Sequence, residues 1–283
     1  MPIAKVNGVS LNYLQLDDVE PRAGREDLIM IHGLATNMAF WYFNYGVPLS
    51  RRFRVTLYDL RGHGRSEMTR DGYTPHMMAA DLRALMDHLG IERAHFLSHS
   101  FGGVVALRFA CEYPQRVASL MLVGAPALSD ERLPPLPLRI WSTTPAGERR
   151  DAIHRHNLRT LMLARDASID ALAVAIHAAN IERDRMRRRR LMLTDALRTL
   201  LPRIACPLAG QWGEHDVLFR GRLGLLAEVL PLARDFRGLT LVPGAGHWVA
   251  YEDAAAFDAA LAVWLAALAG PDPSLRSGAD RLR

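Results

Sequence analysis

The run from His95 to Gly103, with the sequence HFLSHSFGG, constrains the fold of this chain more than any other stretch. A buried strand pattern ends here and a helix pattern begins at Gly102, so Ser100 lies on a sharp strand-to-helix turn. Such a turn pushes the serine hydroxyl out of the sheet. It needs small residues two positions before and two positions after the serine, because strand and helix nearly touch there. Gly102 meets the second requirement, whereas Ser98 meets the first imperfectly, since its hydroxymethyl group must fit where a hydrogen atom is usual.

The composition is that of an ordinary globular protein. The 283 residues suit one large domain, or a domain with an insertion, and 49% of them are hydrophobic. The net charge of +5 comes almost wholly from arginine, because Lys5 is the only lysine, and most basic residues are spread along the chain. We therefore expect no nucleic-acid partner.

The sequence gives no sign of a disulfide framework, a metal site or a membrane segment. Cys111 and Cys206 are the only cysteines and neither has metal-ligand spacing, so both are predicted to be buried thiols. No apolar run follows a basic start, and no window approaches the ~20 apolar residues of a membrane span. We expect a cytoplasmic protein that binds no membrane and uses no metal or other cofactor.

Short apolar runs alternate with amphipathic runs, which predicts a parallel sheet with helices on both faces. An Asn7-Gly8 turn between alternating apolar residues predicts an N-terminal hairpin. Thr74 can cap a helix that Pro75 begins and Gly90 ends. The expected strands lie at 28–31, 54–58, 94–97, 117–123, 208–212 and 239–242, and further helices at 102–113 and 257–268.

The chain changes character between residues 127 and 202, where no convincing strand pattern occurs. This stretch favours a helical insertion over the sheet, with helices expected at 152–163, 169–181 and 191–201. The domains we expect are an α/β core of residues 1–127 and 204–269, a helical cap of residues 128–203, and a disordered tail of residues 270–283.

Four candidate groups follow expected strands, at the carboxyl edge where reactive sites gather in parallel sheets. They are His32-Gly33, Ser100, Asp216 and His247. The chain order serine, aspartate, histidine is the one expected when a serine nucleophile lies on such a sheet.

Five motifs, in this order, resemble those of the α/β-hydrolase-fold superfamily with an inserted helical cap, over about residues 5–268. The resemblance implies an eight-stranded, mostly parallel sheet and a serine hydrolase. The motifs are His32-Gly33, the DLRGHGRS loop at 59–66, the SHSFGG elbow at 98–103, WGEHD at 212–216 and GAGH at 244–247.

Each role also has a chemical reason. A serine hydroxyl is a weak nucleophile near neutral pH and needs a base within hydrogen-bond reach. His247 is expected to take the proton of Ser100, and Asp216 to hold the imidazole tautomer and stabilise its cation. The backbone N–H groups of Leu34 and Phe101 are expected to bind the oxyanion, the latter helped by a helix N-terminus.

Other polar residues near these motifs have structural interpretations. The acid follows the preceding strand in some capped relatives, but here the first carboxylate after that strand is Asp130. His63 and His32 are interpreted as structural residues of their loops, and His99 as a buried hydrogen-bonding residue of the elbow. Six other histidines are expected on the surface or on helices, namely His88, His95, His154, His156, His177 and His215.

Aromatic and apolar residues near the motifs suggest a pocket for a bulky apolar acyl group, although they can equally form part of the core. The candidates are Phe40, Trp41, Trp141, Leu161, Met162 and Trp248.

An arginine run lies between the expected cap helices, at Arg183, Arg185 and 187–190. A solvated helix face is one interpretation. The other is attraction of an anionic substrate, such as a carrier-bound acyl thioester. Neutralising residues 187–190 should then raise KM at low salt and less at high salt.

Several activities fit the same residues. The main expectation is hydrolysis of a small-molecule ester, thioester or lactone through an acyl-enzyme, by a monomer or homodimer. His247-Trp248 resembles carbon–carbon bond hydrolases of vinylogous diketones, but His99 and the loop at 34–37 depart from their pattern. A halogenating perhydrolase and a ligand receptor or inactive scaffold are further alternatives. Dehalogenases and epoxide hydrolases are disfavoured, because they need an aspartate in place of Ser100.

Overall fold

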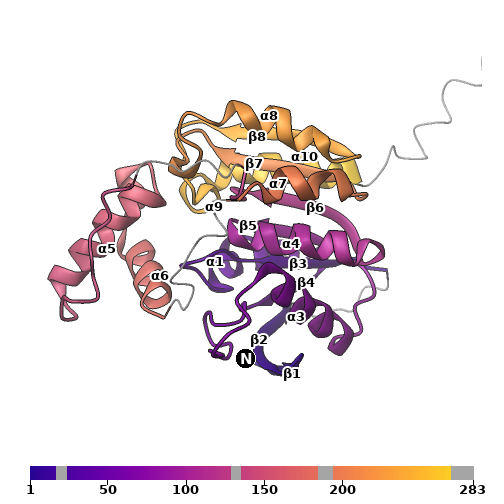
Figure 1. Cartoon of the computed structure of the whole chain (residues 1–283), viewed down its shortest axis with the longest axis horizontal. Helices are drawn as coiled ribbons and strands as arrows, with labels where there is room; N and C mark the ends of the chain where they lie inside the picture. Colours follow the sequence, from indigo (N-terminus) through magenta and orange to yellow (C-terminus); the bar gives the residue numbers. More distant parts are fainter. Residues whose placement is uncertain (17–23, 129–134, 184–193, 269–283) are drawn as a thin grey trace, which may run out of the picture.

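A computed structural model describes residues 1–16, 24–128, 135–183 and 194–268 of the chain. Its centre is one eight-stranded sheet with the order β1-β2-β4-β3-β5-β6-β7-β8 (Figure 1). The strands are β1 (Ile3–Val6), β2 (Val9–Leu16), β3 (Asp27–Ile31), β4 (Arg54–Tyr58), β5 (Ala94–His99), β6 (Val117–Val123), β7 (Leu208–Gly213) and β8 (Phe236–Val242).

The sheet is antiparallel only at its N-terminal edge. β1 and β2 form the predicted hairpin, and Asn7 and Gly8 adopt φ angles of +46° and +70° in its turn. β2 also runs antiparallel to β4, whereas all pairs from β4 to β8 are parallel. The predicted mostly parallel eight-stranded sheet is confirmed.

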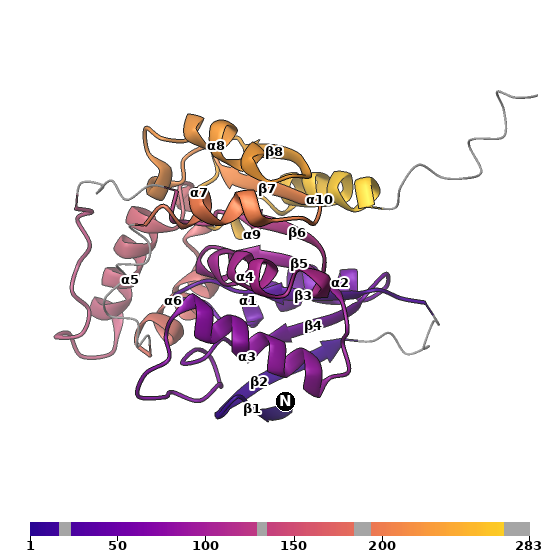
Figure 2. The same cartoon turned by 45° about the vertical axis from the view of Figure 1, so that its right-hand side comes forward.

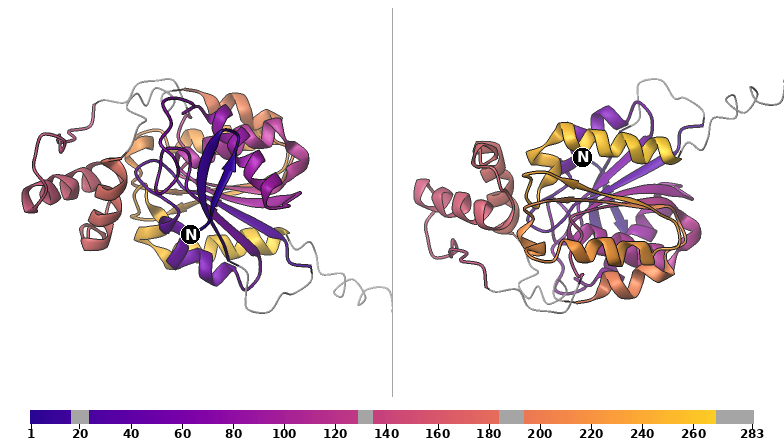
Figure 3. Two further views of the ribbon diagram at one scale, coloured as in Figure 1. Left: turned by 90° about the horizontal axis from the view of Figure 1, so that it is seen from below. Right: turned by 90° about the horizontal axis from the view of Figure 1, so that it is seen from above.

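Helices cover both faces of the sheet (Figure 2, Figure 3). The α-helices are α1 (Ala39–Trp41), α2 (Val47–Leu49), α3 (Pro75–His88), α4 (Phe101–Glu112), α5 (Glu148–Leu161), α6 (Ala171–Ile181), α7 (Ala196–Leu200), α8 (Gly224–Val229), α9 (Val249–Glu252) and α10 (Ala254–Leu268). Short turns of other helix types are η1 (Tyr42–Gly46), η2 (Pro114–Arg116), η3 (Asp166–Ser168), η5 (Leu201–Arg203), η6 (Val217–Phe219) and η7 (Leu230–Leu232).

Two hydrophobic layers lie on opposite faces of the sheet, because successive side chains of a strand point to opposite sides. On β3, Ile29 and Ile31 belong to the layer that also contains buried residues of α3, α4, α7 and α8. Leu28 and Met30 pack on the other layer, which contains α1, α9 and α10. All four side chains are fully buried, as the continuous apolar run predicts.

The helical segment between β6 and β7 divides into two parts. α5 and α6 pack on each other and extend to one side of the sheet (Figure 1). The third expected helix, α7, lies elsewhere: Leu197 and Leu200 are buried in the same layer as α4. The tail at 270–283 lies outside the described residues.

Candidate active site

Ser100 occupies a strained turn between β5 and α4. Its φ and ψ are +52° and −127°, a conformation that side-chain-bearing residues rarely adopt. The N–H of Ser100 donates to Val123 O on the neighbouring strand β6 at 2.8 Å. A Cβ atom at Gly102 would clash with the carbonyl oxygen of His32, so glycine is required there, as the sequence predicted.

Ser98 fits the position where glycine is usual because its hydroxyl has a partner. The side chain is fully buried, and Oγ donates to Met121 O on the neighbouring strand β6 at 3.0 Å. The departure from the usual motif therefore leaves no unpaired hydroxyl.

Three side chains from separate loops form one hydrogen-bonded chain. The Ser100 Oγ donates to His247 Nε2 at 2.8 Å, and His247 Nδ1 donates to Asp216 Oδ2 at 2.7 Å. The exposed fractions of Ser100, His247 and Asp216 are only 3%, 2% and 1%. The three residues predicted as a triad thus lie together at the carboxyl edge of the sheet, and each is almost fully buried.

The start of α4 and the loop after β3 flank the serine. Phe101 begins α4, so its N–H is one of the groups without a partner inside the helix. Leu34 follows His32-Gly33 at the end of β3. A Cβ atom at Gly33 would lie 2.6 Å from Ser100 Cβ, which shows how closely this loop passes the serine.

His32 and His63 brace the loops that flank the site, as their structural interpretation expects. His32 Nε2 accepts from the N–H of Leu60 at 3.0 Å, while its Nδ1 donates to Gly33 O at 2.8 Å. Burial and the neighbouring His63 lower the pKa of His32 to about 4. A histidine that stays neutral at pH 7 and uses both ring nitrogens is a loop anchor rather than a proton carrier.

His99 is fully buried and lies next to His247. Its Nε2 donates to the carbonyl oxygen of His247 at 3.1 Å, and its ring stacks on Phe40 with a centroid distance of 4.7 Å. Burial and the nearby His247 hold the pKa of His99 well below its usual range. The neutral ring therefore supports the backbone of His247.

The aromatic residues predicted for the pocket lie mainly in the core. Phe40 contacts Trp41 and Trp248 edge to face, and both indole rings are fully buried. Trp141 lies near α5 instead, with its ring 6.1 Å from that of His154. These four residues are not among those that line the cavity next to His247.

A cavity of about 520 Å³ opens beside His247, between the core loops and residues that follow α5. Leu161 and Met162, two of the residues predicted for an acyl pocket, line this cavity. His215 is exposed, as expected, and it also lines the cavity. Sequence reasoning missed the other residues of the wall, which are Leu136, Pro137, Arg159, Thr160, Leu163, Ala164, Val217, Arg220 and Gly246.

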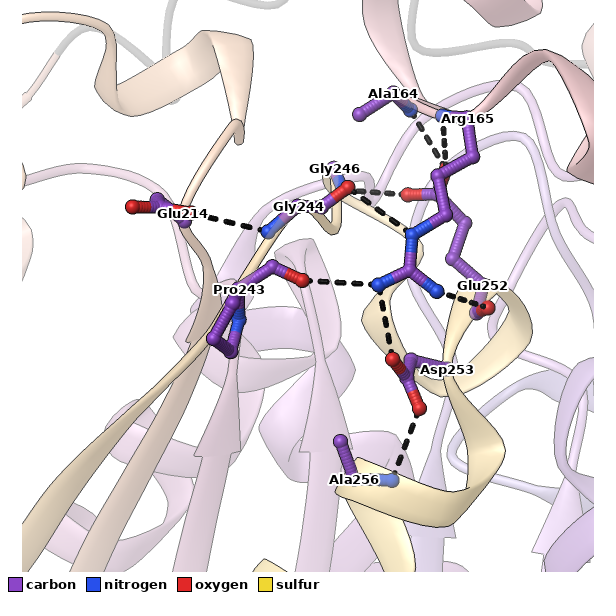
Figure 4. Close-up of polar contacts among 9 residues, drawn as sticks. All are labelled: Ala164, Arg165, Glu214, Pro243, Gly244, Gly246, Glu252, Asp253 and Ala256. Atoms are coloured by element: carbon purple, nitrogen blue, oxygen red, sulfur yellow. Dashed lines mark hydrogen bonds and ion pairs between the residues drawn. The ribbon is translucent and has the colours of Figure 1, made fainter.

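Sequence reasoning also missed Glu252, at the end of α9. Its carboxylate accepts three backbone N–H groups, one of them from Gly246 next to His247 (Figure 4). The only sequence signal is a single carboxylate that ends the otherwise apolar and aromatic run Trp248–Tyr251.

Other predicted features give little further information about the site. Of the arginine run, Arg183 is described and exposed, and Arg185 and 187–190 lie outside the described residues. Cys206 is buried and Cys111 is partly buried. In the described part of the chain, no helix has the length and apolar character of a membrane span. The same part has no group of His, Cys, Asp and Glu side chains suited to a metal ion.

Comparison with known protein families decides the identity of this fold. The family model of the α/β hydrolase fold matches residues 28–167. The chain belongs to the α/β-hydrolase fold family.

Two curated proteins illustrate the relatives of this α/β hydrolase. The 2-hydroxy-6-oxononadienedioate/2-hydroxy-6-oxononatrienedioate hydrolase of Comamonas testosteroni is 29% identical over 249 residues, which are 82% of this chain and 85% of that protein. The dihydrolipoyllysine-residue acetyltransferase component of the acetoin cleaving system of Cupriavidus necator is 37% identical over 127 residues. That match covers 45% of this chain and only 32% of the longer relative.

Solved structures show the same fold for this α/β hydrolase. The enol-lactonase from Burkholderia xenovorans LB400 superimposes with a TM-score of 0.73 and 23% identity. The match covers 94% of this chain and 100% of that one.

Proposed function

We propose that this α/β hydrolase cleaves carboxylic esters, thioesters or lactones through an acyl-enzyme on Ser100. The observation that carries the proposal is the hydrogen-bonded chain from Ser100 through His247 to Asp216, with both distances below 3 Å. An imidazole that accepts the serine proton and is oriented by a buried carboxylate is the arrangement that makes serine nucleophilic.

The proposed reaction has two stages. His247 Nε2 takes the proton of Ser100 Oγ while Oγ adds to the carbonyl carbon, and the same imidazolium then protonates the leaving group. Water, deprotonated by His247, adds to the acyl-enzyme carbonyl, and Ser100 leaves with the proton returned to it. The N–H groups of Leu34 and Phe101 stabilise the oxyanion in both stages, each worth about 3 kcal/mol in comparable sites.

The cavity beside His247 supports an acyl group that is largely apolar. Its wall includes Leu136, Leu161, Met162 and Leu163. A volume of about 520 Å³ lies within the usual range for small-molecule sites.

Removal of the Ser100 hydroxyl tests the proposal. Wild-type protein should release a burst of p-nitrophenol from an activated ester and become labelled by a fluorophosphonate. Ser100→Ala should lose labelling completely and lower kcat by a factor on the order of 10⁶, as for other serine nucleophiles. Circular dichroism provides the folding control. Esterase activity that survives in Ser100→Ala would refute the assignment.

Carbon–carbon bond hydrolysis on the same side chains is the second candidate. It is favoured by the 29% identity to the Comamonas testosteroni hydrolase over most of both chains. The two candidates differ in the leaving group, which is a carbanion equivalent in one and an oxygen or sulfur atom in the other. Parallel assays of a vinylogous diketone, an ester and a thioester distinguish the two candidates. The substrate with the highest kcat/KM identifies which bond the protein prefers to cleave.

A further inference from the structure

The segment after α5 (residues 162–165) is bonded directly to the loop that carries His247. Glu252 makes the central contact: its Oε2 accepts from Gly246 N at 2.5 Å, and its Oε1 accepts from Ala164 N at 2.8 Å and Arg165 N at 2.6 Å (Figure 4). One carboxylate thus joins two pieces of backbone that are far apart in the sequence.

The environment of Glu252 makes these bonds important. The residue is 9% exposed, and burial raises the pKa of its carboxyl above the ordinary value despite the N–H groups that donate to it. A buried carboxylate is costly unless hydrogen bonds compensate it, and hydrogen bonds to an ionised acceptor are the stronger kind. The N–H groups in turn lose their acceptor if the carboxylate is removed.

The side chain of Arg165 adds hydrogen bonds between the segment after α5 and the loop that carries His247. Its Nη2 donates to Pro243 O and to Asp253 Oδ2, both at 2.9 Å, and its Nε lies 3.3 Å from Gly244 O. The guanidinium therefore holds the loop before His247 as well as the residue after α9 (Figure 4).

A backbone hydrogen bond and close packing complete this contact. The N–H of Trp248, next to His247, donates to Met162 O at 2.9 Å. A Cβ atom at Gly246 would lie 2.8 Å from Ala164 N, so the two segments touch with no space between them.

The same segment forms part of the cavity wall. Met162, Leu163 and Ala164 line the cavity, together with Gly246 and His247. The residues that would contact an acyl group and the imidazole that would handle the proton are therefore fixed to each other through Glu252.

We propose that Glu252 is a positioning residue that couples the cavity wall after α5 to the base His247, so that chain-length selectivity and nucleophile activation depend on one side chain. This inference rests on the proposed function.

Glu252→Gln tests the coupling. An amide has one oxygen, so its NH₂ must face either Gly246 N–H or the N–H groups of Ala164 and Arg165, and one of the two connections is lost. We expect the rate of labelling of Ser100 by a small fluorophosphonate to fall about 10- to 100-fold, because small displacements of a catalytic group have effects of that size. The preference of kcat/KM for p-nitrophenyl octanoate over the acetate should fall as well.

Glu214→Gln is the matched control. Glu214 Oε2 accepts from Gly244 N at 3.0 Å, so it bonds the same loop but does not contact the segment after α5 (Figure 4). Its labelling rate and chain-length preference should stay close to wild type. Arg165→Gln weakens the coupling with Glu252 intact, and it should shift both readouts in the same direction as Glu252→Gln.

The outcomes separate the inference from the proposed function. If wild-type protein is not labelled, the proposed function fails and the inference fails with it. If wild type is labelled and the folded fraction of Glu252→Gln is labelled at the same rate, Glu252 only stabilises the fold and the inference alone is wrong. Loss of labelling with an unchanged chain-length preference also overturns the coupling. Should Glu252→Gln fail to fold, Arg165→Gln decides by the same two readouts.

Discussion

Asp216 holds its carboxylate in place with two hydrogen bonds of different kinds. Oδ2 accepts from His247 Nδ1 at 2.7 Å, and Oδ1 accepts from the N–H of Leu218 at 3.0 Å. Asp216→Asn keeps an acceptor for Leu218 but presents NH₂ to His247, which then favours the tautomer with a proton on Nε2. That tautomer is unable to accept the proton of Ser100, so we expect kcat for an activated ester to fall about 10⁴-fold.

Stopped-flow or steady-state assay of Asp216→Asn checks this expectation, with thermal unfolding as the control. The melting temperature should change little, because the amide fits the same space. A loss of less than tenfold in kcat, in a protein that unfolds normally, would mean that Asp216 does not orient the imidazole.

The residues of the candidate site differ in how well the sequence predicts them. Ser100, Asp216 and His247 each follow a strand pattern and lie in a short motif, so their meeting at the sheet edge could be predicted. Glu252 could not, because nothing in the sequence indicates that its partners are the N–H groups of Ala164 and Arg165. Every residue except proline has a backbone N–H, and these two donors belong to no recognisable motif.

At the scale of elements, the start of α4 depends on its approach to β3. A Cβ atom at Gly102 would lie 2.9 Å from Ile31 O and closer still to His32 O, and backbone atoms have little freedom to move away. Gly102→Ala should therefore lower the free energy of unfolding by about 1–3 kcal/mol, the usual cost of overpacking. It should also reduce esterase activity, because α4 carries the N–H of Phe101.

Gly224→Ala provides the control for this substitution. Gly224 begins α8, and no atom lies within 4 Å of a Cβ placed there. The free energy of unfolding of the Gly224→Ala variant should stay the same or rise by about 0.4–1 kcal/mol, since alanine restricts the unfolded chain. Urea unfolding of both variants measures the difference. Equal free energies of unfolding would show that the close approach at Gly102 does not exclude a Cβ atom.

Elements with a strong local pattern were predicted with nearly correct bounds. β4 has the predicted limits, and α3 begins at Pro75 with the hydroxyl of Thr74 accepting from Met77 N at 3.2 Å. β8 begins at Phe236, three residues before the predicted start, because this part of the strand is only half-buried at the sheet edge and contains Gly238 with a φ of +125°. The periodicity correctly predicted a helix at α7, but it does not indicate which element packs against the apolar side of that helix.

On the scale of the whole molecule, the cavity is the feature that sequence reasoning could least predict. Its wall combines residues near 136, 159–164, 215–220 and 246–247, which are brought together by the sheet order and by the contacts of Glu252. Apolar residues such as Leu161 show no pattern that separates cavity wall from core. Trp248 follows His247 in sequence and was open to either interpretation, and the structure buries it fully.

The charge of this cavity leads to a prediction about substrates. Arg159 and Arg220 line it, and none of its lining residues in the described part of the chain is an aspartate or glutamate. Arg159 pairs with Asp166 at 2.9 Å, whereas Arg220 has no acidic partner among the described residues, so Arg220 has the less compensated charge of the two. We expect a terminal carboxylate on the acyl chain to be attracted to the cavity, with a small energy because the guanidinium is exposed.

A pair of p-nitrophenyl esters with matched chain length isolates this effect: the half-ester of adipate ends in a carboxylate, and the hexanoate ends in a methyl group. In Arg220→Gln the kcat/KM ratio of adipate to hexanoate should fall about threefold to fivefold at low salt, equivalent to less than about 1 kcal/mol. The difference should shrink at high salt, because exposed charges are screened. Arg83→Gln removes the same charge from the exposed face of α3, where Arg83 pairs with Asp87, and should leave the ratio unchanged. An equal fall in both variants would assign the effect to the net charge of +5 rather than to the cavity.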